Sequence, residues 1–288
     1  MAGTIDGGVT PHLLSCTVRN CGRPLSRAAG TLACPAGHSF DIARTGYVNL
    51  LQAQDRRSRT PGDTAASVDA RAELLADGVG RTIIDRVVAR ATSLDLPPGA
   101  PVVDLGAGSG EVLGSLARLC SIEAIGLDIS TAAVTRAARD FPDLTWVIAN
   151  ADRRLPFVDG SVRLVLSLHA RRNPAECARV LMPGGHLLVG VPSADDLREL
   201  RETMHGTATV RDRAETVVSE HAPLLVLVAR ETVLERHRLD REAVHDLLRS
   251  TYRGARTGSR GQVEALGAME VTLATDLLLF TPPHARSS

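Results

Sequence analysis

A glycine-rich loop constrains the fold of this chain more than any other feature of its sequence. The segment reads Val-Val-Asp-Leu-Gly-Ala-Gly-Ser-Gly over residues 102–110, and it lies between a predicted strand and a predicted helix. Glycines in such a loop let the backbone turn tightly and approach a ligand, because no Cβ stands in the way. The free N–H groups at the start of the following helix favour a polar or anionic ligand group. The loop therefore predicts an α/β fold with a ligand at the end of one strand.

Short β-rich runs alternate with helical stretches from residue 101 onward, which predicts a parallel sheet covered by helices on both faces. The predicted strands are 101–105, 122–127, 144–148, 163–168 and 186–191, and the predicted helices between them are 111–120, 131–140 and 174–181. Apolar residues at helical spacing predict two earlier helices, 65–75 and 82–94. The C-terminal part predicts a straight or bent strand at 224–239, a helix at 241–251 and a last strand at 269–280.

Acidic residues lie at the ends of three consecutive predicted strands. Asp104 lies in the end of the first strand, Asp128 follows the second and Asp152 follows the third. A carboxylate at the second position accepts hydrogen bonds from ribose hydroxyl groups, and one at the third is suited to an adenine amine. Because the carboxyl ends of parallel strands meet at one edge of a sheet, these groups predict one adenosine-containing ligand. A nicotinamide dinucleotide is the alternative that the loop alone leaves open.

The complete arrangement resembles the class I methyltransferases, which bind S-adenosylmethionine with such a loop and such acidic residues. The segment 179–185 reads Arg-Val-Leu-Met-Pro-Gly-Gly and resembles the turn before the fifth strand of that superfamily, which favours a methyltransferase over a dehydrogenase. The implied fold class is α/β, a class I Rossmann-like methyltransferase with an N-terminal zinc-binding module. The residues expected to bind the cofactor are Asp104, Gly106, Ala107, Gly108, Gly110, Asp128, Ile129, Ala151, Asp152 and Leu168.

The zinc-binding module is predicted from two pairs of side chains near the N-terminus. Four residues separate Cys16 from Cys21, and three separate Cys34 from His38. Structural zinc is bound tetrahedrally by four such ligands, which tight turns bring together. Four protein ligands leave no open position, so the ion would be structural and would supply much of the folding free energy of this segment. Spacing alone leaves a second interpretation, in which three free cysteines lie beside an unrelated histidine.

Several segments resemble one family, the bacterial 23S rRNA (guanine-N1)-methyltransferases, which includes macrolide-resistance enzymes of antibiotic producers. The resemblance covers roughly residues 14–200. The segments that carry it are Cys34–Asp41, Gly46–Leu51, Arg57–Asp63, Ala70–Arg71, Arg172–Glu176 and Pro183–Gly185. It implies methylation of N1 of a guanine in a 23S rRNA hairpin, antibiotic resistance as a consequence, and a Cys3His zinc module.

Three departures from the family pattern favour a different acceptor. The family has Gly-His-Tyr where this chain has Gly78–Gly80, a turn with Phe-Ala-Pro-Arg-Asn where it has Leu168–Asn173, and an aromatic pair where it has Tyr252–Arg256. Aromatic side chains stack on nucleobases, and this chain lacks most of them at these positions. The alternative function is therefore methylation of a small aromatic or indole-type natural product.

Two residues are predicted to act on the acceptor. Guanine N1 must lose its proton as the methyl group arrives, and a nearby base assists this step. His169 follows the fourth strand, where methyltransferases place acceptor-facing residues, and it is predicted as the base, with a solvent-facing loop histidine as the alternative. Tyr252 is predicted as a second contact to the acceptor. Two arginine clusters, 56–59 and 171–172, are predicted either to bind RNA phosphates or to be surface charge.

The formal net charge is zero, which removes the simplest argument for a nucleic-acid partner but allows a local basic surface. No apolar run reaches the roughly 18–20 residues that span a bilayer, so we expect a cytoplasmic protein without a membrane partner. The expected domains are a zinc-binding module at 1–50, a helical linker region at 51–95 and the S-adenosylmethionine-dependent methyltransferase domain at 96–288. The family resemblance also implies a homodimer.

Overall fold

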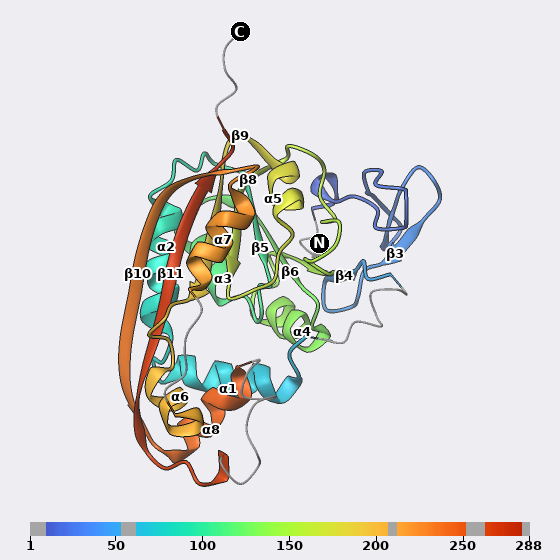
Figure 1. Ribbon diagram of the computed structural model, residues 1–288. Helices are drawn as coiled ribbons and strands as arrows, with labels where there is room; N and C mark the ends of the chain where they lie inside the picture. The colour runs from blue at the N-terminus through green and yellow to red at the C-terminus, as the bar shows by residue number, and fades with distance from the viewer. Residues whose placement is uncertain (1–9, 53–61, 207–211, 252–262, 284–288) are drawn as a thin grey trace.

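The computed structural model describes residues 10–52, 62–206, 212–251 and 263–283 of the 288-residue chain. One large sheet organises it (Figure 1). Its strands are β4 (Tyr47–Asn49), β5 (Ala100–Leu105), β6 (Ile122–Asp128), β7 (Thr145–Ile148), β8 (Val162–Leu168), β9 (Leu181–Pro192), β10 (Val226–Leu239) and β11 (Met269–Thr281). Their order is β10-β11-β9-β8-β5-β6-β7-β4. Neighbours from β9 to β4 are parallel, whereas β11 pairs antiparallel with both β9 and β10.

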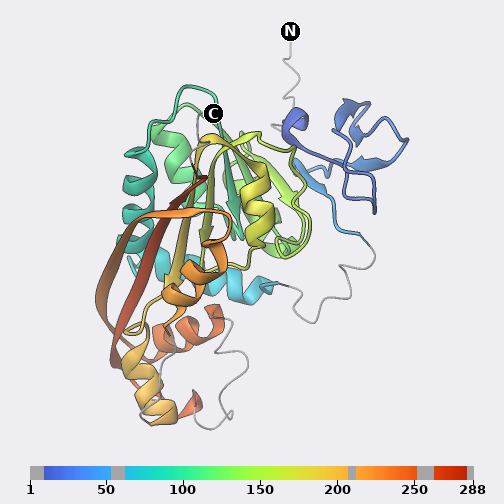
Figure 2. The same ribbon diagram turned by 45° about the horizontal axis from the view of Figure 1, so that its top comes forward.

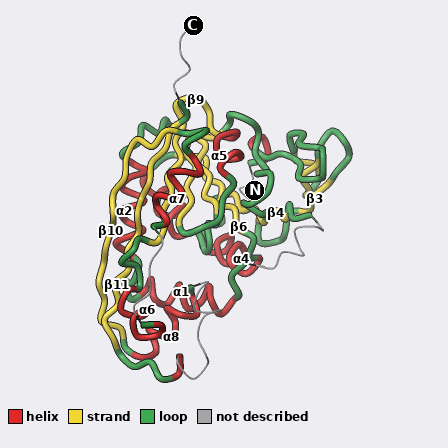
Figure 3. The backbone as a smooth tube through the Cα atoms, viewed as in Figure 1, coloured by secondary structure: helices red, strands yellow, loops and turns green. Residues whose placement is uncertain are grey.

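The central strands are apolar because helices cover both of their faces. In β5, Val102, Val103 and Leu105 are fully buried, and they face alternate sides of the sheet. Figure 3 shows helices on both sides of the strands. The helices are α1 (Ala65–Ala76), α2 (Arg81–Thr92), α3 (Glu111–Leu119), α4 (Thr131–Asp140), α5 (Pro174–Val180), α6 (Arg198–His205), α7 (Arg213–His221) and α8 (Arg241–Ser250).

Three apolar clusters correspond to three groups of helices. One face of the sheet packs against α2, α3 and α4, with Leu113 and Leu116 of α3 fully buried. The opposite face packs against α5, α7 and the N-terminal segment. A third cluster joins α1, α6 and α8 beyond the end of the sheet, where Val79 and Val244 are buried (Figure 1). None of the described helices is long and apolar enough to cross a membrane.

The N-terminal segment is joined to the large sheet. It forms a small antiparallel sheet of β1 (Ser26–Ala28), β2 (Thr31–Ala33) and β3 (Ser39–Asp41), and then β4 pairs with the edge strand β7. Figure 2 shows this segment beside the sheet. Two backbone hydrogen bonds fasten it, from Ser15 N–H to Pro156 O (2.9 Å) and from Val158 N–H to Leu13 O (3.1 Å). Its buried residues belong to the same apolar cluster as strands β5 and β6.

The predicted α/β fold is confirmed, and the predicted strands and helices agree closely with the observed ones. The largest difference is at β9, which begins at Leu181 because Val162 pairs with Leu181 before the register shifts. The region 224–239 forms one strand, with an irregularity between Leu227 and Ala229. The strands β1–β4 and the helices α6 and α7 were not predicted. Three residues are too few to show the alternation of a strand, and charged and polar residues make up most of α6 and α7, which weakens their apolar periodicity.

Candidate functional site

The predicted site residues gather at the carboxyl ends of the central strands. Chain order reverses at β5, since β6 and β7 lie on one side of it and β8 and β9 on the other. Ligands of open α/β sheets bind at such a reversal, outside the carboxyl ends of the strands. The glycine loop connects β5 to α3 at this position, and Asp128 ends the adjacent β6. The structure therefore brings the glycine loop and the predicted ribose-binding carboxylate together.

The three loop glycines have different structural roles. A Cβ on Gly110 would lie 2.4 Å from the ring of Trp146, and one on Gly106 would lie 2.3 Å from the Cβ of Ala170. Both positions therefore exclude a side chain for reasons of packing. A Cβ on Gly108 would have one described neighbour within 4 Å, the Nη1 of Arg71 at 3.5 Å. At Gly108, which has φ of +56°, the position that a Cβ would take thus faces the guanidinium of Arg71 instead of the apolar core.

Asp128 holds the loop in place. The Gly108 N–H donates to its Oδ2 (3.0 Å), and the Ser130 N–H donates to its Oδ1 (2.8 Å). Burial raises the pKa of Asp128, whereas these two N–H donors oppose that rise. Each carboxylate oxygen has two lone pairs, so both keep one for a hydroxyl donor. This geometry suits a ribose.

Asp104 lies beneath the loop and is only 3% exposed. Burial raises its pKa to about 7, and the carboxylates of Asp128 and Glu111 add to the rise. Glu111 itself accepts a hydrogen bond from the Ser109 hydroxyl (2.6 Å). A positively charged ligand above the loop would favour the ionised form of Asp104.

The third strand end is also close to the site. The Asp152 N–H donates to Asn150 Oδ1 (2.9 Å), which forms a tight turn after β7, and Ala151 packs against the apolar cluster behind it. The Asp152 carboxylate pairs through Oδ2 with Arg171 (3.2 Å), an exposed residue that follows β8. Arg171 thus has a carboxylate partner within the chain.

Ile129 and Leu168 are half-buried at the ends of β6 and β8, the two strands that flank β5. Ile129 follows Asp128, and its Cγ2 lies 2.9 Å from where a Cβ of Gly62 would be. Leu168 ends β8, and its Cδ1 occupies the space that a Cβ on Gly190 would need. Ile129 therefore packs beside Gly62 directly after the predicted ribose-binding carboxylate, whereas the described contact of Leu168 is with Gly190 on the neighbouring strand β9.

His169 follows β8 with φ of +53° and is exposed. The ring nitrogen Nε2 of His169 lies 2.9 Å from the hydroxyl of Thr275 on β11, and the backbone N–H of His169 donates to Gly190 O. The surrounding protein desolvates the ring and lowers the pKa of His169 to about 4, and the positive charges of Arg71 and Arg213 lower it further. His169 is therefore neutral at pH 7.

Some predicted residues lie elsewhere or outside the described residues. Tyr252 and the arginine cluster 56–59 are outside the residues that the structure describes. Arg172 is half-buried and donates to Ala170 O (3.1 Å). Val79 lies in the first of the three segments that differ from the family pattern, and it is a buried residue of the third apolar cluster, packed between helices.

The sequence analysis missed three residues near the site: Asp63, Arg71 and Thr275. Asp63 accepts a hydrogen bond at its backbone oxygen from Ser130 Oγ (2.6 Å), directly after the ribose-side carboxylate. The family segments contain Asp63 and Arg71, which was the available signal for these two. No local pattern marks Thr275, which lies on the last strand.

The four predicted metal ligands converge. The ligand atoms of Cys16, Cys21, Cys34 and His38 all lie within 4.8 Å of one another. The Sγ atoms of Cys21 and Cys34 are 3.8 Å apart, and His38 Nδ1 lies 3.4 Å from the Sγ atoms of Cys16 and Cys34. Tetrahedral zinc with ordinary bond lengths requires about 3.8 Å between two sulfurs and about 3.6 Å between sulfur and nitrogen. These three distances are therefore close to those of a tetrahedral zinc site.

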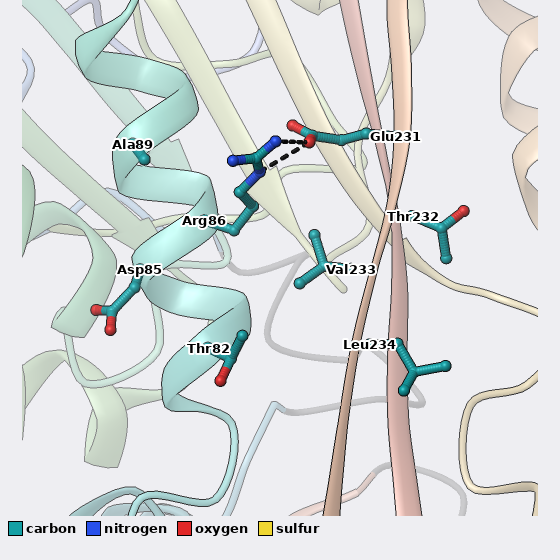
Figure 4. Close-up of a pocket in the computed structure, with 8 residues that line it drawn as sticks. All are labelled: Thr82, Asp85, Arg86, Ala89, Glu231, Thr232, Val233 and Leu234. Carbon is teal, nitrogen blue, oxygen red and sulfur yellow. Dashed lines mark hydrogen bonds and ion pairs between the residues drawn. The ribbon is translucent and has the colours of Figure 1, made fainter.

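A separate surface pocket of about 540 Å³ lies between α2 and β10 (Figure 4). The Arg86 Nε donates to Glu231 Oε2 across it (2.7 Å). None of the predicted site residues lines this pocket.

Comparisons with known proteins agree with both parts of the chain. Residues 15–59 match the zinc ribbon described as RlmA, N-terminal, and residues 102–185 match a methyltransferase domain. A chain from a complex between the Haloferax volcanii Trm112 methyltransferase activator and a methyltransferase aligns with a TM-score of 0.52 and 24% identity. The alignment covers 78% of this chain and 100% of that one, and it shows the shared fold.

Two sequence relatives are more specific. The 23S rRNA (guanine(748)-N(1))-methyltransferase of Streptomyces fradiae is 36% identical over 271 residues, which are 91% of this chain and 95% of that protein. A Micromonospora griseorubida protein assigned as a 23S rRNA (guanine-N(1)-)-methyltransferase is 40% identical over 66% of this chain and 68% of its own length. The chain is an S-adenosylmethionine-dependent methyltransferase with a zinc ribbon, and it belongs to the 23S rRNA (guanine-N1)-methyltransferase family.

Proposed function

We propose that this enzyme methylates N1 of a guanine in a hairpin of 23S rRNA. The observation that carries this proposal is the basic zinc module beside the methyltransferase site. Residues 10–50 contain four arginines and one aspartate, a formal net charge of +3 that becomes +2 when three thiolates hold a zinc ion, although the whole chain is neutral. All four arginines are exposed: Arg19, Arg23, Arg27 and Arg44. A small aromatic acceptor needs no such surface, whereas RNA phosphates do.

The module is positioned to guide RNA toward the cofactor. Its strand β4 pairs with β7, and β7 leads directly into the turn at Asn150–Asp152. Gly22 of the module packs against the guanidinium of Arg154, which lies in the loop after that turn, since a Cβ on Gly22 would lie 3.2 Å from Arg154 Nη2. The basic surface and the adenosine side of the site are therefore neighbours.

The cofactor supplies a methyl group on a positively charged sulfur, and the protein must hold the acceptor in line with it and exclude water. Bond formation at guanine N1 breaks the bond from sulfur to carbon, and the N1 proton must leave. We assign its acceptance to His169, which is neutral at pH 7 and accessible at the end of β8. The Thr275 hydroxyl beside Nε2 orients the ring. We assign binding of the ribose to Asp128 and the adenine amine to Asp152, and Tyr252 stays a predicted contact to the acceptor.

The test uses protein-free 23S rRNA from a strain that lacks guanine-N1 methylation, together with radiolabelled S-adenosylmethionine. We expect label in the RNA and a reverse-transcription stop at one hairpin guanine, because N1 methylation blocks base pairing. Label in the RNA at another atom, or no label while calorimetry shows cofactor binding, would contradict the proposal. The second result would favour the alternative acceptor, a small aromatic metabolite.

A variant with Arg19, Arg23 and Arg44 changed to Gln tests the role of the module. We expect weaker RNA binding and a salt-dependence slope lower by about 2–3, because each lost phosphate contact removes roughly 0.7–0.9 from that slope. Cofactor affinity should not change, since these residues lie in the zinc module. Unchanged RNA affinity would show that the basic surface has another use.

Two further assignments accompany this proposal. Because the proposed substrate is rRNA, we expect the enzyme in the cytoplasm, and fractionation of cells tests this location. The homodimer implied by the family stays a prediction, and sedimentation velocity of the zinc-loaded protein tests it.

A further inference from the structure

Arg71 lies over the glycine loop and takes no part in the roles assigned so far. It belongs to α1, which runs below the sheet near the loop (Figure 1). Its Nη1 is the one described atom within 4 Å of the position that a Cβ on Gly108 would take, at 3.5 Å. A guanidinium therefore occupies the open side of the glycine whose N–H also donates to Asp128.

Two partners fix the guanidinium. Nη1 pairs with Asp63 Oδ2 (3.0 Å), and Nη2 donates to Ser250 O at the end of α8 (2.7 Å). A guanidinium has five N–H donors, so these two partners leave three N–H groups for a ligand. The side chain is 37% exposed, so a ligand can reach these donors.

The charge of Arg71 acts on both sides of the site. It lowers the pKa of Asp128, on the ribose side, and the pKa of His169, on the acceptor side. Arg71 is therefore close both to the ribose-side carboxylate and to His169. Asp63 adds a link to the ribose side, because its backbone oxygen accepts the Ser130 hydroxyl and Gly62 packs against Ile129.

S-adenosylmethionine has adenosine at one end and an α-carboxylate at the other, with the sulfonium between them. Gly108 donates to Asp128 and faces Arg71, so a ligand whose ribose binds Asp128 would extend across Gly108 toward the guanidinium. A carboxylate there requires a cation, and a guanidinium offers two parallel N–H donors in the matching geometry. We infer that Arg71 binds the α-carboxylate of the cofactor's methionine moiety and that Asp63 is a positioning residue that holds its guanidinium. The inference rests on the methyltransferase activity and is independent of the acceptor.

The test compares two ligands that differ only in this carboxylate, S-adenosylmethionine and decarboxylated S-adenosylmethionine. Calorimetry gives the ratio of their dissociation constants for the zinc-loaded full-length chain and for R71M, R71K and D63N. We expect the wild-type chain to prefer the carboxylated ligand by roughly 10- to 100-fold, as hydrogen bonds to a charged group imply. In R71M the ratio should fall to near one, and in R71K and D63N it should be intermediate. The matched control is R86M, which removes an arginine from the exposed pair with Glu231 and should leave the ratio unchanged.

A purely structural role of Arg71 would weaken both ligands equally and leave the ratio at its wild-type value, which would overturn the inference. If R71M does not fold, the ratio in R71K and D63N decides the question in the same way. An unchanged ratio together with weaker RNA binding would place Arg71 on an RNA phosphate instead. No RNA enters the calorimetric measurement, so failure of the proposed rRNA methylation would leave its result intact.

Discussion

Substitution of Asp104 by Asn should change the pH dependence of stability in a way that the structure quantifies. Asp104 is 3% exposed, and burial together with the nearby carboxylates raises its pKa from 3.8 to about 7. The native protein therefore keeps a proton that the unfolded chain releases above pH 3.8. This proton stabilises the native state fully below pH 3.8, and the stabilisation is lost as the pH rises toward 7.

The magnitude follows from the size of the shift. Each pH unit in this window costs the wild-type protein about 1.4 kcal/mol of unfolding free energy, because one more proton is bound in the native state. Asn does not titrate. The unfolding free energy of D104N minus that of the wild type should therefore rise by about 3 kcal/mol between pH 5 and pH 8. The fixed cost of burying an Asn amide cancels in this difference between two pH values.

The assay is urea unfolding at several pH values without cofactor, followed by fluorescence of Trp146. This is the one tryptophan of the chain, and it packs under Gly110 and Gly126 near Asp104. Asp143→Asn is a suitable control, because Asp143 is exposed and hydrated in both states. A difference between D104N and wild type that stays constant within about 1 kcal/mol from pH 5 to pH 8 would refute the burial argument.

Three other predictions use different parts of the structure. H169A should lower kcat by roughly 100- to 10,000-fold with little change in cofactor affinity. At saturating S-adenosylmethionine, which favours the ionised form of Asp104, the wild-type kcat should stay constant from pH 8 to pH 6 and fall only as the pH approaches about 4, because the neutral ring of His169 is the active form. A decline of kcat centred near pH 6.5 would contradict the lowered pKa of His169. C34S removes one zinc ligand, so the zinc content measured by atomic emission should fall below one ion per chain. Tm should also fall, because Cys34 belongs to an apolar cluster shared with the large sheet. An unchanged zinc content would exclude the assigned site. G110A should reduce the free energy of unfolding by about 1–3 kcal/mol, because the new Cβ would meet Trp146 at 2.4 Å and would be strained at a φ of +90°. If G110A cost as much in a W146A background as in the wild-type protein, the contact with Trp146 would not be the cause.

Local patterns identified most of the architecture. The strands and helices from residue 100 onward follow from apolar runs and helical spacing, since buried parallel strands need apolar side chains on both faces. The zinc ligands follow from two short spacings, because each pair lies on one tight turn and needs no information about the rest of the chain. The three-residue strands of the module are too short for such patterns, and α6 and α7 contain too few apolar residues.

The glycine loop illustrates, in one segment, what residue spacing predicts and what only tertiary contacts show. Its spacing predicts the cofactor site, and it suggests one common reason for all three glycines. The structure separates them, because Gly106 makes room for Ala170, Gly110 makes room for Trp146, and Gly108 faces Arg71. The residues that make these contacts lie far from the loop in sequence.

The sequence by itself determined the sheet-forming segments and the four converging metal ligands, and it predicts the cofactor loop and its acidic residues. Only the tertiary structure decided which distant groups lie beside the predicted site residues: Thr275 beside His169, 106 residues away, and Arg71, which is bound to Ser250, 179 residues away. The physical reason is that period and spacing act over a few residues, whereas these contacts depend on strand order. β11 inserts between β9 and β10, and this order brings Thr275 beside the end of β8.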